Sequence, residues 1–164
     1  IWGGPAKKIP SLMIALSGMG VGLLIAGLRP SAVVVSIGLF VLLFSIPIAA
    51  GISQAFWQSK IPPELQGRVF SLRLLLSMGA TPLSYVLAGP IADGIFQPML
   101  EEGGALSGIV GDIIGTGAGR GAGAFFVVLG ILTVAVVSYS ATRPNIREVD
   151  TAIPDVAEEE PALV

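Results

Sequence analysis

The distribution of charged residues is the feature that most constrains what this chain can fold into. Four stretches contain no Asp, Glu, Lys, Arg or His: residues 9–28, 30–59, 74–92 and 121–142. Each stretch is at least 19 residues long and consists mostly of aliphatic side chains, Gly and Phe. A helix needs about 20 apolar residues to cross the roughly 30 Å hydrocarbon core of a bilayer. The chain is therefore predicted to cross a membrane four times.

The composition is typical of a membrane protein. Hydrophobic residues make up 53% of the 164 residues and charged residues 12%, with a mean hydropathy of +0.85, whereas soluble domains carry about 25% charged residues. The chain has no Cys and no His, which excludes disulfide, thiolate and imidazole chemistry. We therefore expect a protein that is not an enzyme, uses no cofactor or metal, contacts membrane lipid and binds no nucleic acid.

We expect an all-α membrane protein with four transmembrane helices. Pro10 suits the first turn of the first helix, where its missing N–H costs nothing. Ser31 can cap the second helix, and Pro47, deep inside it, favours a kink. Pro63 begins a third helix whose charged first turns, 64–73, we place at the membrane interface. The predicted spans cover about residues 9–28, 31–58, 74–92 and 122–141.

Three segments lie outside the predicted spans, and their basic residues predict the orientation. Residues 1–8 form a short loop, residues 94–121 a Gly-rich external loop, and residues 143–164 a disordered tail. Lys and Arg in short loops concentrate on the cytoplasmic side of a membrane. Both ends of the chain are therefore predicted to be cytoplasmic, in a protein of the cell membrane. The side predicted to be cytoplasmic receives Lys7, Lys8, Lys60, Arg68, Arg73, Arg143 and Arg147, and the other side only Arg29 and Arg120.

Small residues recur at four-residue spacing in two of the predicted spans. The first series is Gly18, Gly22 and Ala26, and small residues at this spacing allow two helices in lipid to approach closely. The second series is Ser84, Ala88 and Ala92. Each series either packs statically or forms a smooth seam along which helices move during transport.

Three segments beside the predicted spans resemble those of a known transporter family. They are Trp2–Lys8 (WGGPAKK), Ile61–Leu72 (IPPELQGRVFSL) and Leu87–Asp93 (LAGPIAD). The first is similar to the loop before the ninth helix of the major facilitator superfamily. The other two resemble the loop after helix ten and the end of helix eleven in its bacterial drug- and macrolide-efflux-type members. The resemblance implies helices nine to twelve plus the tail, within the C-terminal six-helix bundle. Because the chain begins with Ile1 rather than Met, we expect a piece of a longer protein.

The same resemblance implies a role for the residues flanking the spans on the cytoplasmic side. They either fix only the topology or join a charge network that locks the outward or inward state. Glu64 and Arg68 lie at the i, i+4 spacing at which side chains can pair on a helix. The candidates for gating or topology are Gly3, Gly4, Lys7, Lys8, Glu64, Gly67 and Arg68.

The second predicted span carries the candidate substrate-binding residues. Six positions fall roughly on one helical face and combine aromatic surface, polar groups and a proline, as do the walls of pockets for apolar molecules. The resemblance places the tenth helix beside the central cavity and the ninth and twelfth outside it. Ordinary helix packing is the alternative explanation. The six candidates are Ser36, Phe40, Phe44, Pro47, Gly51 and Gln54.

The sequence therefore favours the C-terminal part of a secondary transporter, an antiporter that exports a small amphipathic compound by ion-coupled alternating access. The four spans contain no titratable carboxylate, Lys, Arg or His, so any ion coupling is expected in the missing N-terminal helices, and the fragment is not expected to transport alone. The alternative is a four-span scaffold or anchor that binds a partner through its tail. A membrane enzyme is disfavoured because no nucleophile, base and orienting group converge.

Overall fold

The structure is a computed structural model that describes residues 7–108 and 110–156. Its four long helices are α1 (Lys8–Leu28), α2 (Ala32–Lys60), α3 (Pro63–Ile91) and α6 (Arg120–Ala141). The short elements are a π-helical turn η1 (Ala92–Phe96), α4 (Gln97–Leu100), α5 (Gly111–Ile114), α7 (Pro144–Arg147) and α8 (Val149–Ala152). Every regular element in the described ranges is helical, which confirms the all-α fold.

Four helices are long and apolar enough to cross a membrane, as predicted. The first, second and fourth begin and end within two residues of the predicted spans. The third is longer, because α3, η1 and α4 form one helix of 38 residues from Pro63 to Leu100. Pro90 does not end it: the chain continues through Ile91 into η1, and π-helical turns occur mostly as single turns within α-helices. The loop before α6 therefore begins after Leu100 and not at residue 94.

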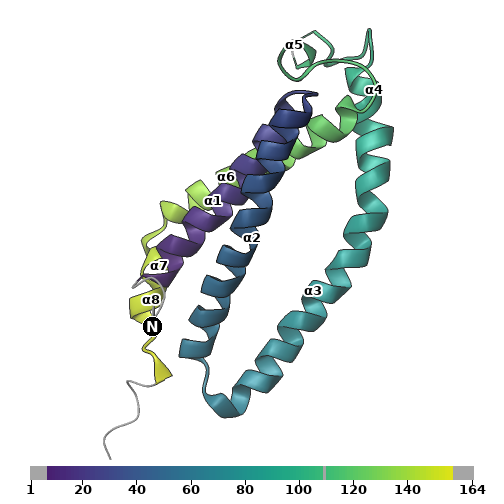
Figure 1. Cartoon of the computed structure of the whole chain (residues 1–164). Helices are drawn as coiled ribbons and strands as arrows, with labels where there is room; N and C mark the ends of the chain where they lie inside the picture. Colours follow the sequence, from purple (N-terminus) through teal and green to yellow (C-terminus); the bar gives the residue numbers. More distant parts are fainter. Residues whose placement is uncertain (1–6, 109, 157–164) are drawn as a thin grey trace, which may run out of the picture.

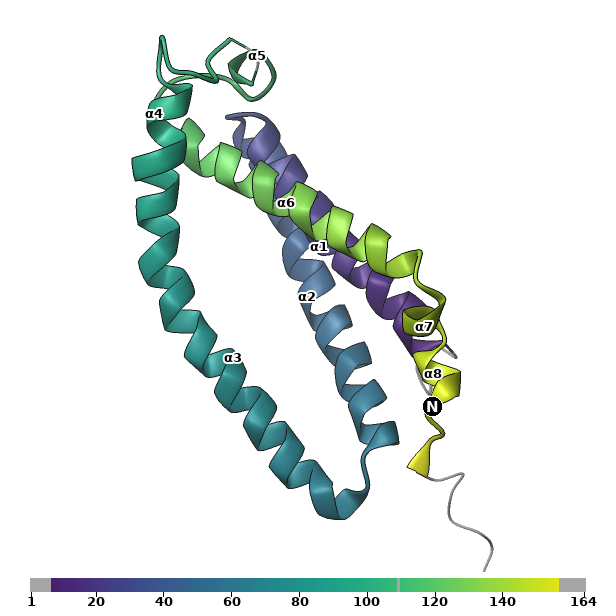
Figure 2. The ribbon, with the colours of Figure 1, turned by 180° about the vertical axis from the view of Figure 1, so that it is seen from behind.

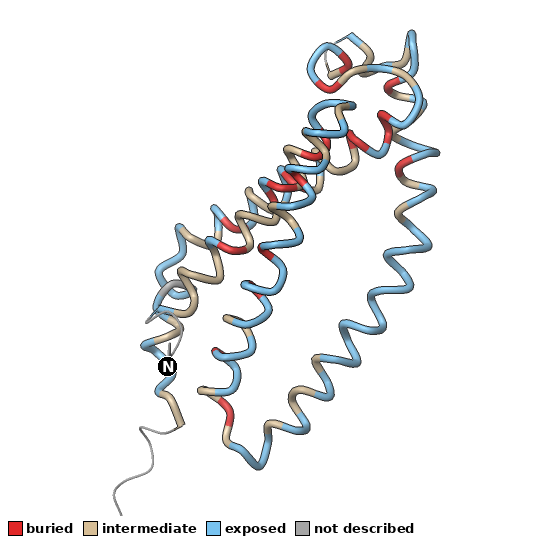
Figure 3. The backbone as a smooth tube through the Cα atoms, in the orientation of Figure 1, coloured by how far each residue is buried: buried red, intermediate tan, exposed pale blue. Residues whose placement is uncertain are grey.

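Helices α1, α2 and α6 pack together, with α1 in contact with both of the others (Figures 1 and 2). Helix α3 stands apart from this bundle along most of its length in both views, and η1 and α4, which continue it, contact α6. None of the α3 residues is buried, and Figure 3 draws this helix almost entirely as exposed. We call the end where α1 begins and α8 lies the tail end, and the opposite end the loop end.

Small residues bring α1 and α2 together, as the first predicted series requires. Gly22 and Gly38 face each other across the contact, and a Cβ on Gly22 would lie 2.6 Å from the Leu42 backbone nitrogen. Ala26 lies against Gly38, and Gly18 lies against the side chain of Ser45. The predicted close approach is confirmed for this series.

A second seam, which the sequence analysis did not predict, joins α1 to α6. Gly20 lies against Gly130, and Gly27 lies against Gly123, again with backbone close to backbone. Gly20 and Gly27 are seven residues apart on α1, and Gly123 and Gly130 are seven residues apart on α6. Residues at this spacing lie on one face of a helix. Helix α1 therefore presents one small-residue face to each of its two neighbours.

The second predicted series forms no packing seam among the described residues, and its packing role stays a prediction. Ser84 is exposed and Ala88 is half-buried, and only Ala92 is buried. Ala92 is buried because its carbonyl oxygen lies against Gly121 at the start of α6, where the long third helix reaches the bundle.

Two smaller predictions about α2 have different outcomes. Ser31 occupies the N-cap position, but its side chain makes no capping hydrogen bond, and only its backbone oxygen accepts one, from Val35 N at 2.9 Å. The predicted side-chain cap is therefore wrong. Helix α2 runs without a break through Pro47, and the predicted kink stays a prediction.

The loop end is a folded cap. Leu100, Ile114 and Ala124 form a buried cluster, against which Phe96 and Val127 pack. The side chain of Gln97 ties the loop to α6, since its Nε2 donates to Gly117 O at 3.0 Å and its Oε1 accepts from Gly121 N at 2.9 Å. Arg120, which is 6% exposed, donates from Nη2 to Gly27 O at 2.8 Å and so satisfies a terminal carbonyl of α1.

The described part of the tail is folded, in contrast to the disorder predicted for residues 143–164. Residues 144–156 contain α7 and α8 and turn back onto the tail end of the bundle, where Ile9 N donates to Asp150 Oδ2 at 2.8 Å. The backbone N–H groups in the first turn of a helix have no partner within the helix, and Asp150 satisfies one of those in α1. Residues 157–164 lie outside the described residues.

Candidate functional site

The six candidate substrate residues lie on one exposed face of α2. All six residues are exposed, and Phe40 and Phe44 are 68% and 61% exposed. The two rings stack with their centroids 5.9 Å apart. No helix in the described part of the chain covers this face, so ordinary packing inside the four-helix unit does not explain its composition. A substrate-binding role stays a prediction.

Three of the six residues border a hollow between α1 and α2, which we call the α1–α2 hollow. Phe44, Pro47 and Gly51 contribute to its wall, and its volume is about 750 Å³. Ser45 is the buried polar residue of this wall, and its hydroxyl is already bonded to Val41 O at 2.8 Å. The hollow therefore presents mostly apolar surface. Its full lining is Ser11, Ile14, Ala15, Gly18, Phe44, Ser45, Pro47, Ile48, Gly51, Ile52 and Ala55.

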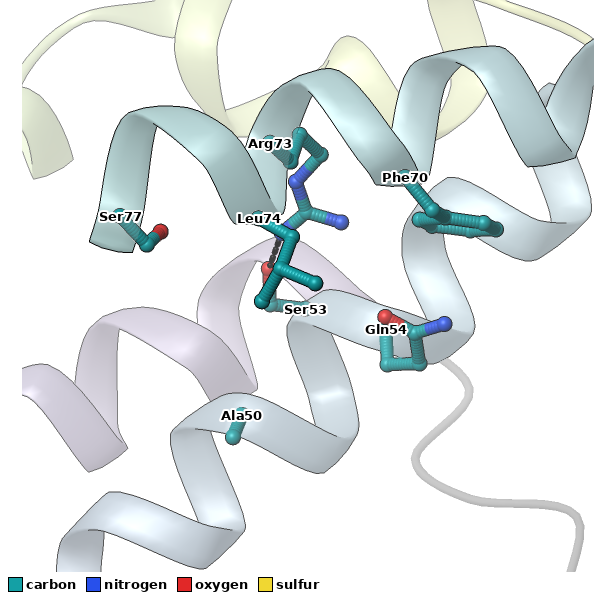
Figure 4. Close-up of a pocket in the computed structure, with 7 residues that line it drawn as sticks. All are labelled: Ala50, Ser53, Gln54, Phe70, Arg73, Leu74 and Ser77. Atoms are coloured by element: carbon teal, nitrogen blue, oxygen red, sulfur yellow. Dashed lines mark hydrogen bonds between the residues drawn. The ribbon is translucent and has the colours of Figure 1, made fainter. Parts of the chain in front are cut away.

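Gln54 points to a second, more polar pocket between α2 and α3, which we call the Arg73 pocket (Figure 4). Its volume is about 520 Å³, and its lining is Ala50, Ser53, Gln54, Phe70, Arg73, Leu74 and Ser77. Arg73 reaches from α3 to α2, where its Nη2 donates to Ser53 Oγ at 3.0 Å.

The sequence analysis counted Arg73 only as a basic residue that sets the orientation. A signal for its position was present, because Ser53 and Arg73 lie at similar distances on either side of the Pro62–Pro63 turn. Two antiparallel helices joined by a short turn bring such positions side by side.

The tail end holds an ion-pair cluster, which we define as Lys8, Ser59, Lys60, Asp150 and Asp155. Lys60 Nζ lies 2.7 Å from Asp155 Oδ1 and donates to Asp150 O at 2.8 Å, while the Lys60 side chain is only 7% exposed. Lys8 Nζ lies 3.5 Å from Asp155 Oδ2 and donates to Ser59 Oγ at 2.7 Å. The start of α1, the end of α2 and the tail are thus joined by one cluster.

The ion-pair cluster lowers the pKa of one of its two carboxylates, that of Asp155. The hydrogen bond from Lys60 lowers the pKa of Asp155 below its ordinary value of 3.8, helped by Ser59 and by the charge of Lys8. Partial desolvation acts in the opposite direction and is outweighed. Asp155 is therefore held in its charged form, which maintains both contacts with the lysines.

The candidates for cytoplasmic gating are not brought together as a group. Lys8 belongs to the ion-pair cluster, whereas Lys7, Glu64, Gly67 and Arg68 are exposed. The spacing of Glu64 and Arg68 allows an ion pair, but the described residues show ion pairs only between Asp155 and the two lysines of the cluster. Gly3 and Gly4 lie outside the described residues, and the gating role stays a prediction.

The fold and these surfaces define a multi-pass, all-helical membrane protein. The chain is 32% identical to macrolide efflux protein A of Streptococcus pyogenes over 102 residues, which are 58% of this chain and 24% of that protein. It is also 32% identical to macrolide efflux protein A of Enterococcus faecalis over 90 residues, which are 51% of this chain and 26% of that protein. These similarities confirm the predicted resemblance to macrolide-efflux-type transporters.

The similarity covers only part of the relatives. The chain spans about a quarter of the length of the curated relatives it matches. No protein-family profile matches the chain, and no solved structure matches it.

Proposed function

We propose that this chain is part of a membrane transporter that exports a small amphipathic compound, and that α2 lines the path of that compound. The observation that carries the proposal is the exposed face of α2 from Ser36 to Gln54. It combines stacked phenylalanines with polar groups and borders the α1–α2 hollow. Pockets for drug-sized ligands combine mostly apolar walls with a few polar groups. The macrolide efflux relatives support export, which is not an enzymatic activity, and a macrolide is the natural first test compound.

We further propose that α1, α2, the α3–α4 helix and α6 correspond to helices nine to twelve of the major facilitator arrangement. Transporters of this type place the substrate between repeated helical units. The exposed α2 face and the absence of buried residues in α3 are expected if further helices of the same transporter pack there. The excess of Lys and Arg at the tail end favours a cytoplasmic location for both ends of the chain.

The scaffold alternative is less well supported. The curated relatives are named as efflux proteins and not as scaffolds, and two acidic residues in the described part of the tail are not free to bind a partner. Asp150 and Asp155 are instead engaged by Ile9, Lys60 and Lys8 of the same chain.

An accumulation assay tests the proposed export. A bacterial host that lacks its own macrolide exporters is given the complete gene that encodes this chain, and cellular uptake of a labelled macrolide is measured. We expect less accumulation than in the empty host, and a loss of most of this difference with Phe44→Ala. Ile131→Ala, which removes a 57% exposed side chain from α6, is the matched control and should transport normally. Equal accumulation with and without the protein for every amphipathic compound tried would contradict the proposal.

A vesicle assay tests the expectation that these four helices do not transport alone. The 164-residue chain is reconstituted, and macrolide flux is compared with that of empty vesicles. We expect no difference, because a cavity between two helical units needs both of them. Flux above that of empty vesicles would show that the four helices are sufficient.

A further inference from the structure

The Arg73 pocket has features that the export proposal does not use. Arg73 is the last charged residue before the uncharged stretch 74–92, so it lies at the edge of the predicted span. Its side chain is half-buried and crosses from α3 to α2. Charged groups at this depth are costly and usually pair with an opposite charge or with polar groups. In the described residues the Arg73 guanidinium is hydrogen-bonded to Ser53 and to no carboxylate.

Two aromatic rings hold the guanidinium in place. The Arg73 Cζ atom lies 5.0 Å from the centroid of the Trp57 ring and 5.8 Å from that of the Phe70 ring. Both distances are within the range of cation–π attraction. A guanidinium fixed in this way loses little conformational freedom when it binds a ligand.

The remaining lining is suited to a molecule with a polar head and an apolar body. A guanidinium has five N–H donors, and one hydrogen bond, to Ser53, is present. Gln54 and Ser77 place an amide and a hydroxyl on the same pocket, while Ala50, Phe70 and Leu74 supply apolar surface. The pocket volume of about 520 Å³ lies within the roughly 300–1,000 Å³ of small-molecule sites.

We propose that the Arg73 pocket binds the carboxylate or phosphate head of an anionic amphiphile. The fork of Arg73 matches both head groups, which accept two parallel hydrogen bonds from a guanidinium. The apolar body of the ligand lies along Leu74 and Phe70. This chemistry has two sources, a phospholipid of the membrane and an amphipathic compound that the protein exports. Binding at this pocket does not depend on the export proposal, because it is measured without transport.

Trp57 provides a direct reporter for the test. The chain has two tryptophans, so Trp2→Phe leaves only Trp57, whose ring contacts Arg73. The full chain is placed in mixed vesicles of phosphatidylcholine and phosphatidylglycerol in which only one of the two lipids is brominated, at equal bromine content, and quenching of Trp57 is recorded. We expect phosphatidylglycerol to quench more strongly than its fraction in the bilayer predicts. Equal quenching by the two lipids, together with no effect of the soluble probe described below, would overturn the proposal without any further variant.

Variants of Arg73 test whether its charge and shape are responsible. Arg73→Gln should weaken the preference for the anionic lipid by about tenfold, the size of a lost charge-assisted hydrogen bond. Arg73→Lys keeps the charge without the planar fork, so its preference for the anionic lipid should lie between those of the parent and of Arg73→Gln. Arg143→Gln is the matched control, because Arg143 also lies over an aromatic ring, Tyr139 at 4.6 Å, but is exposed. An unchanged preference in Arg73→Gln, with helicity intact by circular dichroism, would overturn the proposal.

A soluble probe separates the two sources. Dodecyl phosphate is added to phosphatidylcholine vesicles and to vesicles that contain brominated phosphatidylglycerol, with dodecyltrimethylammonium as the cationic control. A change in Trp57 fluorescence with dodecyl phosphate, and relief of quenching by phosphatidylglycerol, supports a site open to both sources. Quenching by phosphatidylglycerol that dodecyl phosphate does not relieve supports a lipid site, and a response to dodecyl phosphate alone supports a site for a soluble amphiphile.

Discussion

Gly22 of α1 and Gly38 of α2 face each other, and a Cβ on either one would lie within 2.8 Å of a carbonyl oxygen of the other helix. No side chain separates the two backbones at this point. Since apolar side chains gain nothing by leaving lipid for other apolar side chains, close backbone packing is a main source of helix association in membranes. The Gly22–Gly38 contact therefore sets the distance between the two helices that border the α1–α2 hollow.

Gly38→Val should separate α1 from α2 and destabilise the bundle. The added side chain meets the Ala26 backbone, which cannot move without the whole helix, and overpacking of this kind costs about 1–3 kcal/mol. Thermal unfolding in detergent, followed by circular dichroism, measures the loss. Gly79→Ala is the control, because a Cβ at Gly79 meets nothing within 4 Å. Equal unfolding temperatures for Gly38→Val and the parent would contradict the close contact.

Arg120→Ala should loosen the loop end. The substitution removes the donor to Gly27 O and leaves a carbonyl at the end of α1 without its partner, which costs about 1–3 kcal/mol for a buried group. Hydrogen exchange at residues 24–28 and 120–124 reports the opening. Arg29→Ala, at an exposed position on the same end, is the control, and similar exchange in both variants would argue against the cap.

Docking of the tail should depend on pH through Asp155. Its pKa is lowered in the folded state, so the carboxylate contributes stability above its unfolded pKa of about 3.8, and this contribution is lost as the pH falls through the lower folded value. Tail docking should therefore be stable at neutral pH and weaken below about pH 4. Proteolysis at residues 148–156 measures the change, with pepsin at acid pH and proteinase K at neutral pH.

Asp155→Asn should make docking weaker at neutral pH and remove most of its pH dependence. Asp112→Asn, at an exposed position on the loop end, is the matched control and should behave as the parent does. A tail that is cut equally fast in the parent and in Asp155→Asn at every pH would contradict the role of the ion-pair cluster.

The spans were predictable because one physical requirement, a long stretch without charge, acts locally on the sequence. The end of the third helix was not predictable in this way, since the uncharged stretch ends at residue 92. The continuation of the helix through η1 depends on packing of Ala92 against Gly121. The α1–α6 seam had a signal in the seven-residue spacing of Gly20 with Gly27 and of Gly123 with Gly130, but pairing the two helices requires tertiary structure.

The candidate site was predicted in part for the same reason. Helical periodicity places Phe40, Phe44 and Gln54 on one face of α2, and the structure leaves that face exposed. Periodicity within one helix does not reveal which neighbours complete a pocket. The hollow needs Ile14 and Gly18 of α1, and the Arg73 pocket needs a contact across a turn. The contacts of Asp155 with Lys8 and Lys60 join residues far apart in sequence and were missed entirely.

Substrate protection of a single cysteine tests most directly whether the α2 face lines an export path. The chain has no cysteine of its own, so Phe44→Cys introduces one label site in it, and Ile131→Cys on α6 serves as control. Labelling by a water-soluble maleimide is measured in membranes that carry the protein of the complete gene, with and without a saturating macrolide. The account predicts that Phe44→Cys is labelled and that the macrolide slows its labelling severalfold, while labelling of Ile131→Cys stays slow and unaffected. Labelling of Phe44→Cys that no exported compound changes, or no labelling at all, would contradict it.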